Sequence, residues 1–89
     1  MMLKTWDEEA WEDYVSYQSE DKKTLKKINA LIKDIERNGA SHGIGKPEPL
    51  KGNYQGWYSR RVDDKNRLVY KVQDNSILIA QCKSHYGDK

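Results

Sequence analysis

The strongest periodic pattern in the 89-residue chain is a stripe of apolar positions between residues 21 and 38. Its members recur at the three- and four-residue spacing of one helix face: Leu25, Ile28, Leu31, Ile32 and Ile35. The pair Asn38-Gly39 follows directly and is typical of a helix end. We therefore predict a helix that starts near Asp21 and ends at this pair.

A shorter helical pattern precedes this stripe, from Asp7 to about residue 19. Asp7 is a suitable N-cap residue, and two glutamates follow it in the first predicted turn. The large apolar side chains of the segment belong to Trp11, Tyr14 and Val15. Their spacing predicts that these three residues form the buried side of the helix.

Beyond residue 56 the apolar period changes to two, which is the period of a β-strand. Segments 57–62, 67–73 and 76–84 read as strands that are joined by turn-like residues, and residues 2–6 can add a short strand. In segment 67–73 one face is apolar, while the opposite face carries Arg67 and Lys71.

This order of elements predicts an α+β fold. We expect residues 1–89 to form one domain in which two N-terminal helices pack on one face of a mostly antiparallel four-stranded sheet. The other face of the sheet should stay partly open.

Residues 39–56 form a connection rich in glycine and proline, GASHGIGKPEPLKGNYQG. Connections of this length in a compact domain are usually functional or disordered. Glu48 lies between Pro47 and Pro49, and a proline restricts the residue before it to extended conformations. We therefore expect an extended backbone at Glu48, which suits the aiming of a side chain, although these residues taken alone fit a stiff turn between a helix and a strand better.

The amino-acid composition indicates the compartment in which the protein works. Hydrophobic residues make up 36% of the chain, phenylalanine is absent, and the mean hydropathy is −1.06. No apolar run approaches the roughly 20 residues of a membrane span, so we expect no membrane association. Cys82 is the single cysteine, which excludes an intrachain disulfide and fits a small core residue. These features indicate a cytoplasmic protein.

Charge is distributed unevenly along the chain. Residues 7–21 carry seven acidic and no basic residues, whereas residues 22–89 carry fifteen Lys or Arg against seven Asp or Glu. The excess of positive charge indicates a polyanionic partner for one face of the protein. Charge alone fits two solvated faces equally well.

Arg61 and Arg67 are the first candidates for contact with such a partner. Alternation places Arg61 on the same face as Trp57 and Ser59, and pairing of the two strands would place it across from Arg67. Two neighbouring guanidinium groups repel each other unless an anion joins them, and their planar forks suit phosphate oxygens. We predict that this pair binds a phosphate.

Glu48 and His85 are candidates for acid–base chemistry. Glutamate is ionised near neutral pH and can take a proton, whereas histidine titrates close to neutral pH and can donate one. With arginines at a phosphate and the Tyr86 ring under an unstacked base, this set suits RNA cleavage through the ribose 2′-hydroxyl. Lys46 and Lys51 would offset the repulsion between Glu48 and the phosphate.

Simpler interpretations exist for each residue taken singly. His85 can be a polar residue near the chain end, and Tyr86 can cover the edge of the core. Arg60, next to Arg61, reads as solvated or ion-paired. The spacing of histidine and cysteine does not fit a metal site, so we expect no metal and no cofactor.

As a set, the motifs resemble YoeB-type toxins of the RelE/ParE superfamily, from bacterial type II toxin–antitoxin modules. The matching stretches span nearly the whole chain: WxxEAWEDY, KKINALIKDI, GKPEPLKG, WYSRR, NRLVYKV and the closing HY. The resemblance implies a RelE-like microbial ribonuclease fold and cleavage of mRNA in the ribosomal A site, which inhibits translation. It also implies a YefM-type antitoxin as partner, and it makes a homodimer plausible.

The resemblance further implies roles for individual residues. Glu48 would be the general base, His85 the general acid, and Arg67 the residue that stabilises the phosphate. The substrate contacts would come from Lys51, Arg61 and Tyr86.

Two other function classes use the same features. A non-catalytic module could bind the ribosome or nucleic acid, or act as a co-repressor with the antitoxin, by charge alone. A gyrase poison of the ParE branch would share the fold, but gyrase binding gives no reason for the set of Glu48, Arg67, His85 and Tyr86.

Overall fold

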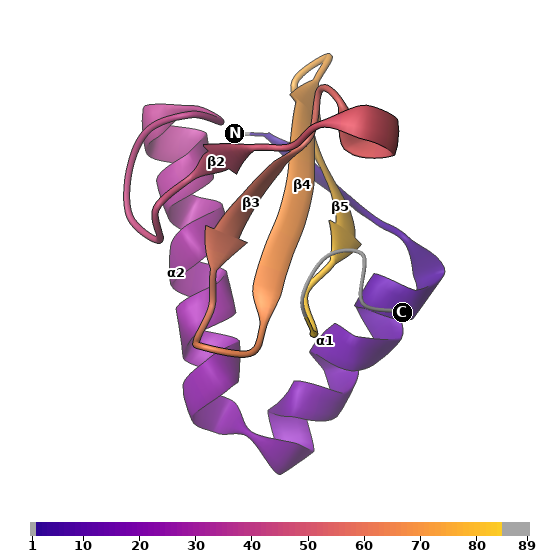
Figure 1. Ribbon diagram of the computed structural model, residues 1–89. Coiled ribbons are helices and arrows are strands. Elements are labelled where there is room, and N and C mark those ends of the chain that lie inside the picture. Colours follow the sequence, from indigo (N-terminus) through magenta and orange to yellow (C-terminus); the bar gives the residue numbers. More distant parts are fainter. Residues whose placement is uncertain (1, 85–89) are drawn as a thin grey trace.

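Two helices and a five-stranded sheet make up the computed structural model, which describes residues 2–84 (Figure 1). The elements in chain order are β1 (Leu3–Trp6), α1 (Glu8–Glu20), α2 (Lys22–Asn38), β2 (Glu48–Pro49), the 3₁₀ turn η1 (Gly52–Tyr54), β3 (Tyr58–Arg61), β4 (Arg67–Gln73) and β5 (Ser76–Gln81). The sheet order is β1-β5-β4-β3-β2. Only the β1–β5 pair is parallel among these strands, which confirms the α+β class and the mostly antiparallel sheet.

The predicted number of strands was wrong, because the sheet has five strands rather than four. Residues Glu48 and Pro49 pair antiparallel with β3 as a two-residue edge strand. A strand of two residues that contains one proline and follows another shows no alternation, and the sequence pattern therefore reads it as loop. The last strand also ends at Gln81, three residues earlier than predicted.

Helix α2 matches its prediction closely. The Asp21 carboxylate caps its N-terminus by accepting a hydrogen bond from the Thr24 N–H at 3.1 Å. At the other end, the N–H of Gly39 donates to the Ile35 carbonyl, and Gly39 has a φ of 88°. The predicted apolar stripe faces the sheet: Ile28, Leu31, Ile32 and Ile35 are buried, and Leu25 packs against them.

The buried side of α1 differs from its prediction. Trp11 and Val15 are 48% and 42% exposed, whereas Ala10 and Tyr17 are buried, with Tyr14 packed beside them. Positions 10, 14 and 17 form a regular helical stripe. The small Ala10 lets the helix backbone approach β5 so closely that the Cys82 thiol reaches the Ala10 carbonyl at 3.5 Å. Side-chain size alone therefore indicated the wrong face.

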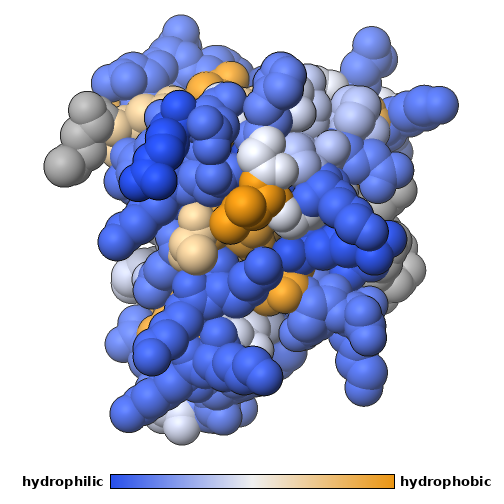
Figure 2. All heavy atoms as spheres, turned by 90° about the vertical axis from the view of Figure 1, so that its left-hand side faces the viewer, coloured by the Kyte–Doolittle hydropathy of each residue, from blue (hydrophilic) through white to orange (hydrophobic). Residues whose placement is uncertain are grey.

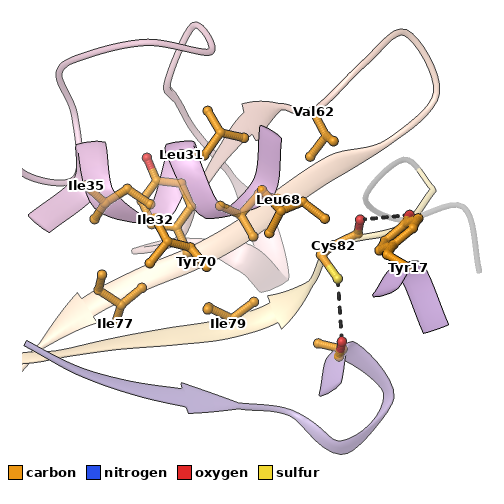
Figure 3. Packing of buried hydrophobic residues seen from close by; sticks show 12 residues of the cluster. Tyr17, Leu31, Ile32, Ile35, Val62, Leu68, Tyr70, Ile77, Ile79 and Cys82 are labelled. Carbon is orange, nitrogen blue, oxygen red and sulfur yellow. Dashed lines mark hydrogen bonds between the residues drawn. The ribbon is translucent and has the colours of Figure 1, made fainter. Parts of the chain in front are cut away.

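The core lies between the two helices and one face of the sheet (Figure 3). Side chains of α2 meet Leu68 and Tyr70 of β4 and Ile77 and Ile79 of β5, all of which are buried. Cys82 is part of this core, as predicted, and its carbonyl accepts a hydrogen bond from the Tyr17 hydroxyl at 3.3 Å. We call the face of the sheet that is turned toward the helices the inner face, and the opposite one the outer face.

Neither helix in the described part of the chain is long and apolar enough to cross a lipid bilayer.

Candidate active site

Strand pairing places Glu48 on the outer face of the sheet. Glu48 is the register partner of Ser59 in β3, and Ser59 is the partner of Val69 in β4. Directly paired residues point to the same face, and Tyr58 and Arg60 on either side of Ser59 therefore point to the inner face. The exposed Glu48 carboxylate thus stands at the edge of the outer face, on a backbone that is extended as predicted.

The segment around Glu48 is anchored on both sides. After the strand, the N–H of Leu50 donates to the Trp57 carbonyl at 2.9 Å, and the Leu50 side chain is buried. Before it, the N–H of Arg61 donates to the Gly45 carbonyl at 2.7 Å. Lys46 and Lys51 flank this anchored segment, and both are exposed to solvent.

Arg61 and Arg67 are register partners in β3 and β4, as the hairpin pattern predicted. Arg61 lies two residues from Ser59 along β3, and Arg67 lies two residues from Val69 along β4. All four residues therefore point to the outer face. Arg61 is exposed, while Arg67 is half-buried and donates from Nη1 to the carbonyls of Asp63 at 2.6 Å and Asn66 at 3.1 Å. The turn therefore fixes the direction of the Arg67 guanidinium.

The chain is held beside Arg67 as far as Ser84. The carbonyl of Ser84 accepts hydrogen bonds from the Arg67 N–H at 3.0 Å and from Gln81 Nε2 at 2.9 Å. Its N–H donates to Asn66 Oδ1 at 2.7 Å. The next two residues, His85 and Tyr86, are site residues predicted from the sequence, and both lie outside the described residues.

A buried arginine organises the connection that leads to Glu48, and sequence reasoning missed its role. Arg60 has no exposed surface, so the prediction of a solvated residue was wrong. The alternative prediction, an ion pair, is confirmed, because Arg60 Nη1 lies 2.5 Å from Asp34 Oδ2. All five guanidinium N–H groups can be assigned: Nε donates to the Tyr70 hydroxyl, Nη1 to Asp34 and the Ile44 carbonyl, and Nη2 to the carbonyls of Gly39 and His42.

Residues 39–44 are therefore wrapped around one cation rather than disordered. The Tyr70 hydroxyl adds a hydrogen bond of 2.5 Å to the Ala40 carbonyl, and Asp34 accepts from the Ile44 N–H at 3.0 Å. Gly43 is required at the closest approach, because a Cβ there would lie 1.7 Å from Asp34 Oδ2.

The side of the molecule that carries α2 and this connection presents a mostly hydrophilic surface with small apolar patches (Figure 2).

We expect Asp34 to make stability sensitive to acid. The hydrogen bond from Arg60 holds the pKa of the Asp34 carboxyl below its ordinary value of 3.8. A lowered folded-state pKa contributes stability that is complete above the ordinary value and is lost as the pH falls through the folded-state value. Urea unfolding midpoints, measured from about pH 6 to about pH 2, should therefore fall more steeply in the wild type than in Asp34→Asn. Parallel curves would contradict this assignment.

Among the described residues, no three His, Cys, Asp or Glu side chains gather in a way that could hold a metal ion. The outer face instead brings together one carboxylate, Glu48, and the guanidinium of Arg67 with Arg61 beside it. Such a surface can hold a phosphate group next to a proton acceptor.

The chain is similar to known proteins over most of its length. The family model of the YoeB-like toxin of bacterial type II toxin–antitoxin systems matches residues 6–86. Toxin YoeB of Escherichia coli K12 is 54% identical over 85 residues, which cover 96% of this chain and all of that protein.

Two solved structures from Staphylococcus aureus are similar over nearly the whole chain. A YoeB–YefM complex contains a chain with 55% identity and a TM-score of 0.91, and the match covers 97% of this chain and 99% of that one. A YoeB dimer gives 56% identity and a TM-score of 0.90, with 96% and 98% covered. Since sequence and fold agree over nearly the whole chain, this protein belongs to the family of YoeB-like toxins of bacterial type II toxin–antitoxin systems.

Proposed function

We propose that this toxin is a ribosome-dependent endoribonuclease that cuts mRNA in the A site and thereby inhibits translation. The observation that carries the proposal is the shared outer face: Glu48 on its edge strand, with Arg61 and Arg67 two residues farther along β3 and β4. The ribosome would present the mRNA to this surface. The activity belongs in the cytoplasm, where translation takes place.

The chemistry follows from the roles of the groups. Glu48 takes the proton of the ribose 2′-hydroxyl, and the 2′-oxygen forms a bond to the adjacent phosphorus. The bond from phosphorus to the 5′-oxygen breaks, and the leaving oxygen receives a proton from His85. The products are a 2′,3′-cyclic phosphate and a 5′-hydroxyl, and the reaction requires no metal ion.

Cations stabilise the charge that builds on the phosphate during this reaction. Arg67 contributes from a direction fixed by the turn carbonyls of Asp63 and Asn66, and Arg61 from an exposed position opposite it. Lys46 and Lys51 flank Glu48, where their positive charges offset the repulsion between its carboxylate and the phosphate. Tyr86 stacks on a base of the substrate.

The position of Ser84 supports a role for His85 at the same phosphate. Ser84 is bonded to Asn66 and to the backbone of Arg67, so the residue before His85 is fixed beside the arginine that holds the phosphate. His85 follows Ser84 directly in the sequence, and this supports our choice of His85 as the acid.

We further propose a YefM-like antitoxin as the partner that inactivates this chain, and a homodimer as its free form. The support is the similarity to the YoeB–YefM complex and to the YoeB dimer.

The ends of the cleavage products test the proposed reaction. Ribosomes programmed with a defined mRNA should yield fragments that carry a 2′,3′-cyclic or 3′-phosphate and a 5′-hydroxyl. An mRNA with 2′-deoxynucleotides in the A-site codon should remain intact, because it lacks the attacking group. Cleavage of that deoxy codon would contradict the mechanism, and arrested translation with uncut mRNA would indicate a binding module instead.

A further inference from the structure

A second feature of the outer face lies beside the candidate active site and has no part in the reaction proposed above. The ammonium group of Lys71 stands 5.9 Å from the centroid of the Trp57 ring. Next to the pair, a hollow of about 440 Å³ extends across β5 toward β1, with Trp57, Leu78, Ala80, Thr5 and Asp7 in its lining.

The strand register places this pair on the same face as Glu48. Tyr58 and Tyr70 are paired and point to the inner face, so their neighbours Trp57 and Lys71 point to the outer one. Lys71 is paired with Leu78, and Leu78 with Thr5. These residues form one row across the sheet, and the row through Glu48 and Ser59 runs next to it.

The separation of the two rows fits a nucleotide chain. Trp57 precedes Ser59, the partner of Glu48, by two residues, which corresponds to roughly 6.5–7 Å along a strand. A single strand whose scissile phosphate lies near Glu48 therefore reaches Trp57 with a neighbouring, unstacked nucleotide.

The chemistry of the hollow distinguishes the base from the phosphate. The half-buried Trp57 offers an aromatic surface, and aromatic rings bind any base by stacking. Asp7 lines the hollow, and its side chain makes no capping hydrogen bond to α1. The negative charge of Asp7 repels a phosphate. Its carboxylate oxygens can accept a hydrogen bond from the amino group of a base. Lys71 lies between Trp57 and Leu78 in this row and can bind the phosphate.

We propose that Trp57, Lys71 and this hollow form a subsite for an unpaired nucleotide of RNA, next to the nucleotide at which cleavage occurs. The subsite rests on the proposed function in one respect, the identity of the substrate, but it needs no catalysis. It adds a stacking contact and one phosphate contact to the cationic pair Arg61 and Arg67.

Binding of a strand that cannot be cut tests the subsite separately from the reaction. The probe is a tetranucleotide of deoxyadenosine, which lacks the 2′-hydroxyl, titrated to millimolar concentration while the heat of binding is recorded by calorimetry. We expect binding by the wild type and an affinity about 5- to 100-fold weaker for Trp57→Ala. Trp57→Tyr should retain most of the affinity, because it keeps an aromatic face. This variant also shows whether a loss in Trp57→Ala comes from the missing ring or from a folding defect.

Two further variants make the result specific. Trp11→Ala removes an exposed tryptophan that lies on the helix side, in contact with Trp6 and Tyr14, and should leave the affinity unchanged. Lys71→Met should lower the slope of log K against log salt concentration by about 0.7, the value for one phosphate contact on a single strand.

Three results would overturn the subsite: no binding by the wild type at millimolar probe, equal affinity of Trp57→Ala and wild type, or an equal loss in Trp11→Ala. Loss of antitoxin binding in Trp57→Ala with unchanged affinity for the probe would assign the hollow to a protein partner instead. Glu48→Gln removes a negative charge beside the phosphate and should bind the probe at least as tightly as the wild type, so a failure of the proposed reaction is recognised independently.

Discussion

Glu48→Gln should cut mRNA on programmed ribosomes about 10²–10⁴-fold more slowly than the wild type. Glutamine keeps the size of the side chain but cannot take the 2′-hydroxyl proton. Glu48 is exposed on a two-residue edge strand, so the substitution should change the free energy of unfolding by no more than about 0.5 kcal/mol. The lost rate therefore measures the chemical step rather than the fold.

The measurement is single-turnover cleavage with excess toxin, followed by primer extension. A lower maximal single-turnover rate at an unchanged half-saturating toxin concentration is the signature of a group that acts in the transition state. Glu20→Gln, a matched change at an exposed position of α1, should retain the full rate. If Glu48→Gln cleaves as fast as this control, another group is the base.

Arg60→Ala should destabilise the protein by about 3–5 kcal/mol, which is the usual cost of removing one partner of a buried ion pair. The variant leaves Asp34, the Tyr70 hydroxyl and three carbonyls of residues 39–44 without the guanidinium that they share. A small domain has a total stability of only about 5–15 kcal/mol. We therefore expect a large shift in the midpoint of urea unfolding.

The neighbouring arginine supplies the control for this prediction. Arg61→Ala removes the same side chain from an exposed position and should change stability by less than about 0.5 kcal/mol. Arg60→Lys keeps the charge but offers three donors in place of five, so its stability should lie between those of wild type and Arg60→Ala. Similar unfolding midpoints for Arg60→Ala and Arg61→Ala would show that the connection 39–44 does not depend on Arg60.

Sequence patterns predicted the elements that are regular and long. The apolar stripe of α2 is unambiguous because several large aliphatic residues share one face, and the pairing of Arg61 with Arg67 follows from the short turn between their strands. Helix α1 was harder, because its buried side consists of Ala10, Tyr14 and Tyr17, and the small Ala10 carries less hydrophobic signal than the exposed Trp11 beside it. Strand β2 is too short and too rich in proline to show a period.

The role of Arg60 illustrates a different limit. Alternation with Tyr58 placed Arg60 on the inner face, and that signal was available in the sequence. Its partners are mostly backbone carbonyls of a glycine-rich segment, however, and carbonyls are the same in every residue. A pattern of side chains therefore cannot predict which carbonyls bind Arg60. Only the folded chain shows that the connection 39–44 surrounds this cation.

Strand β2 has one more consequence, for colloidal behaviour. It forms one of the two borders of the sheet, where unpaired backbone groups can recruit a strand from another molecule and start aggregation. A border of two residues, one of them Pro49 without an N–H group, is a poor template for such growth. The same prolines that hold Glu48 in place should thus protect the toxin from fibril formation during any interval in which it stands without a partner.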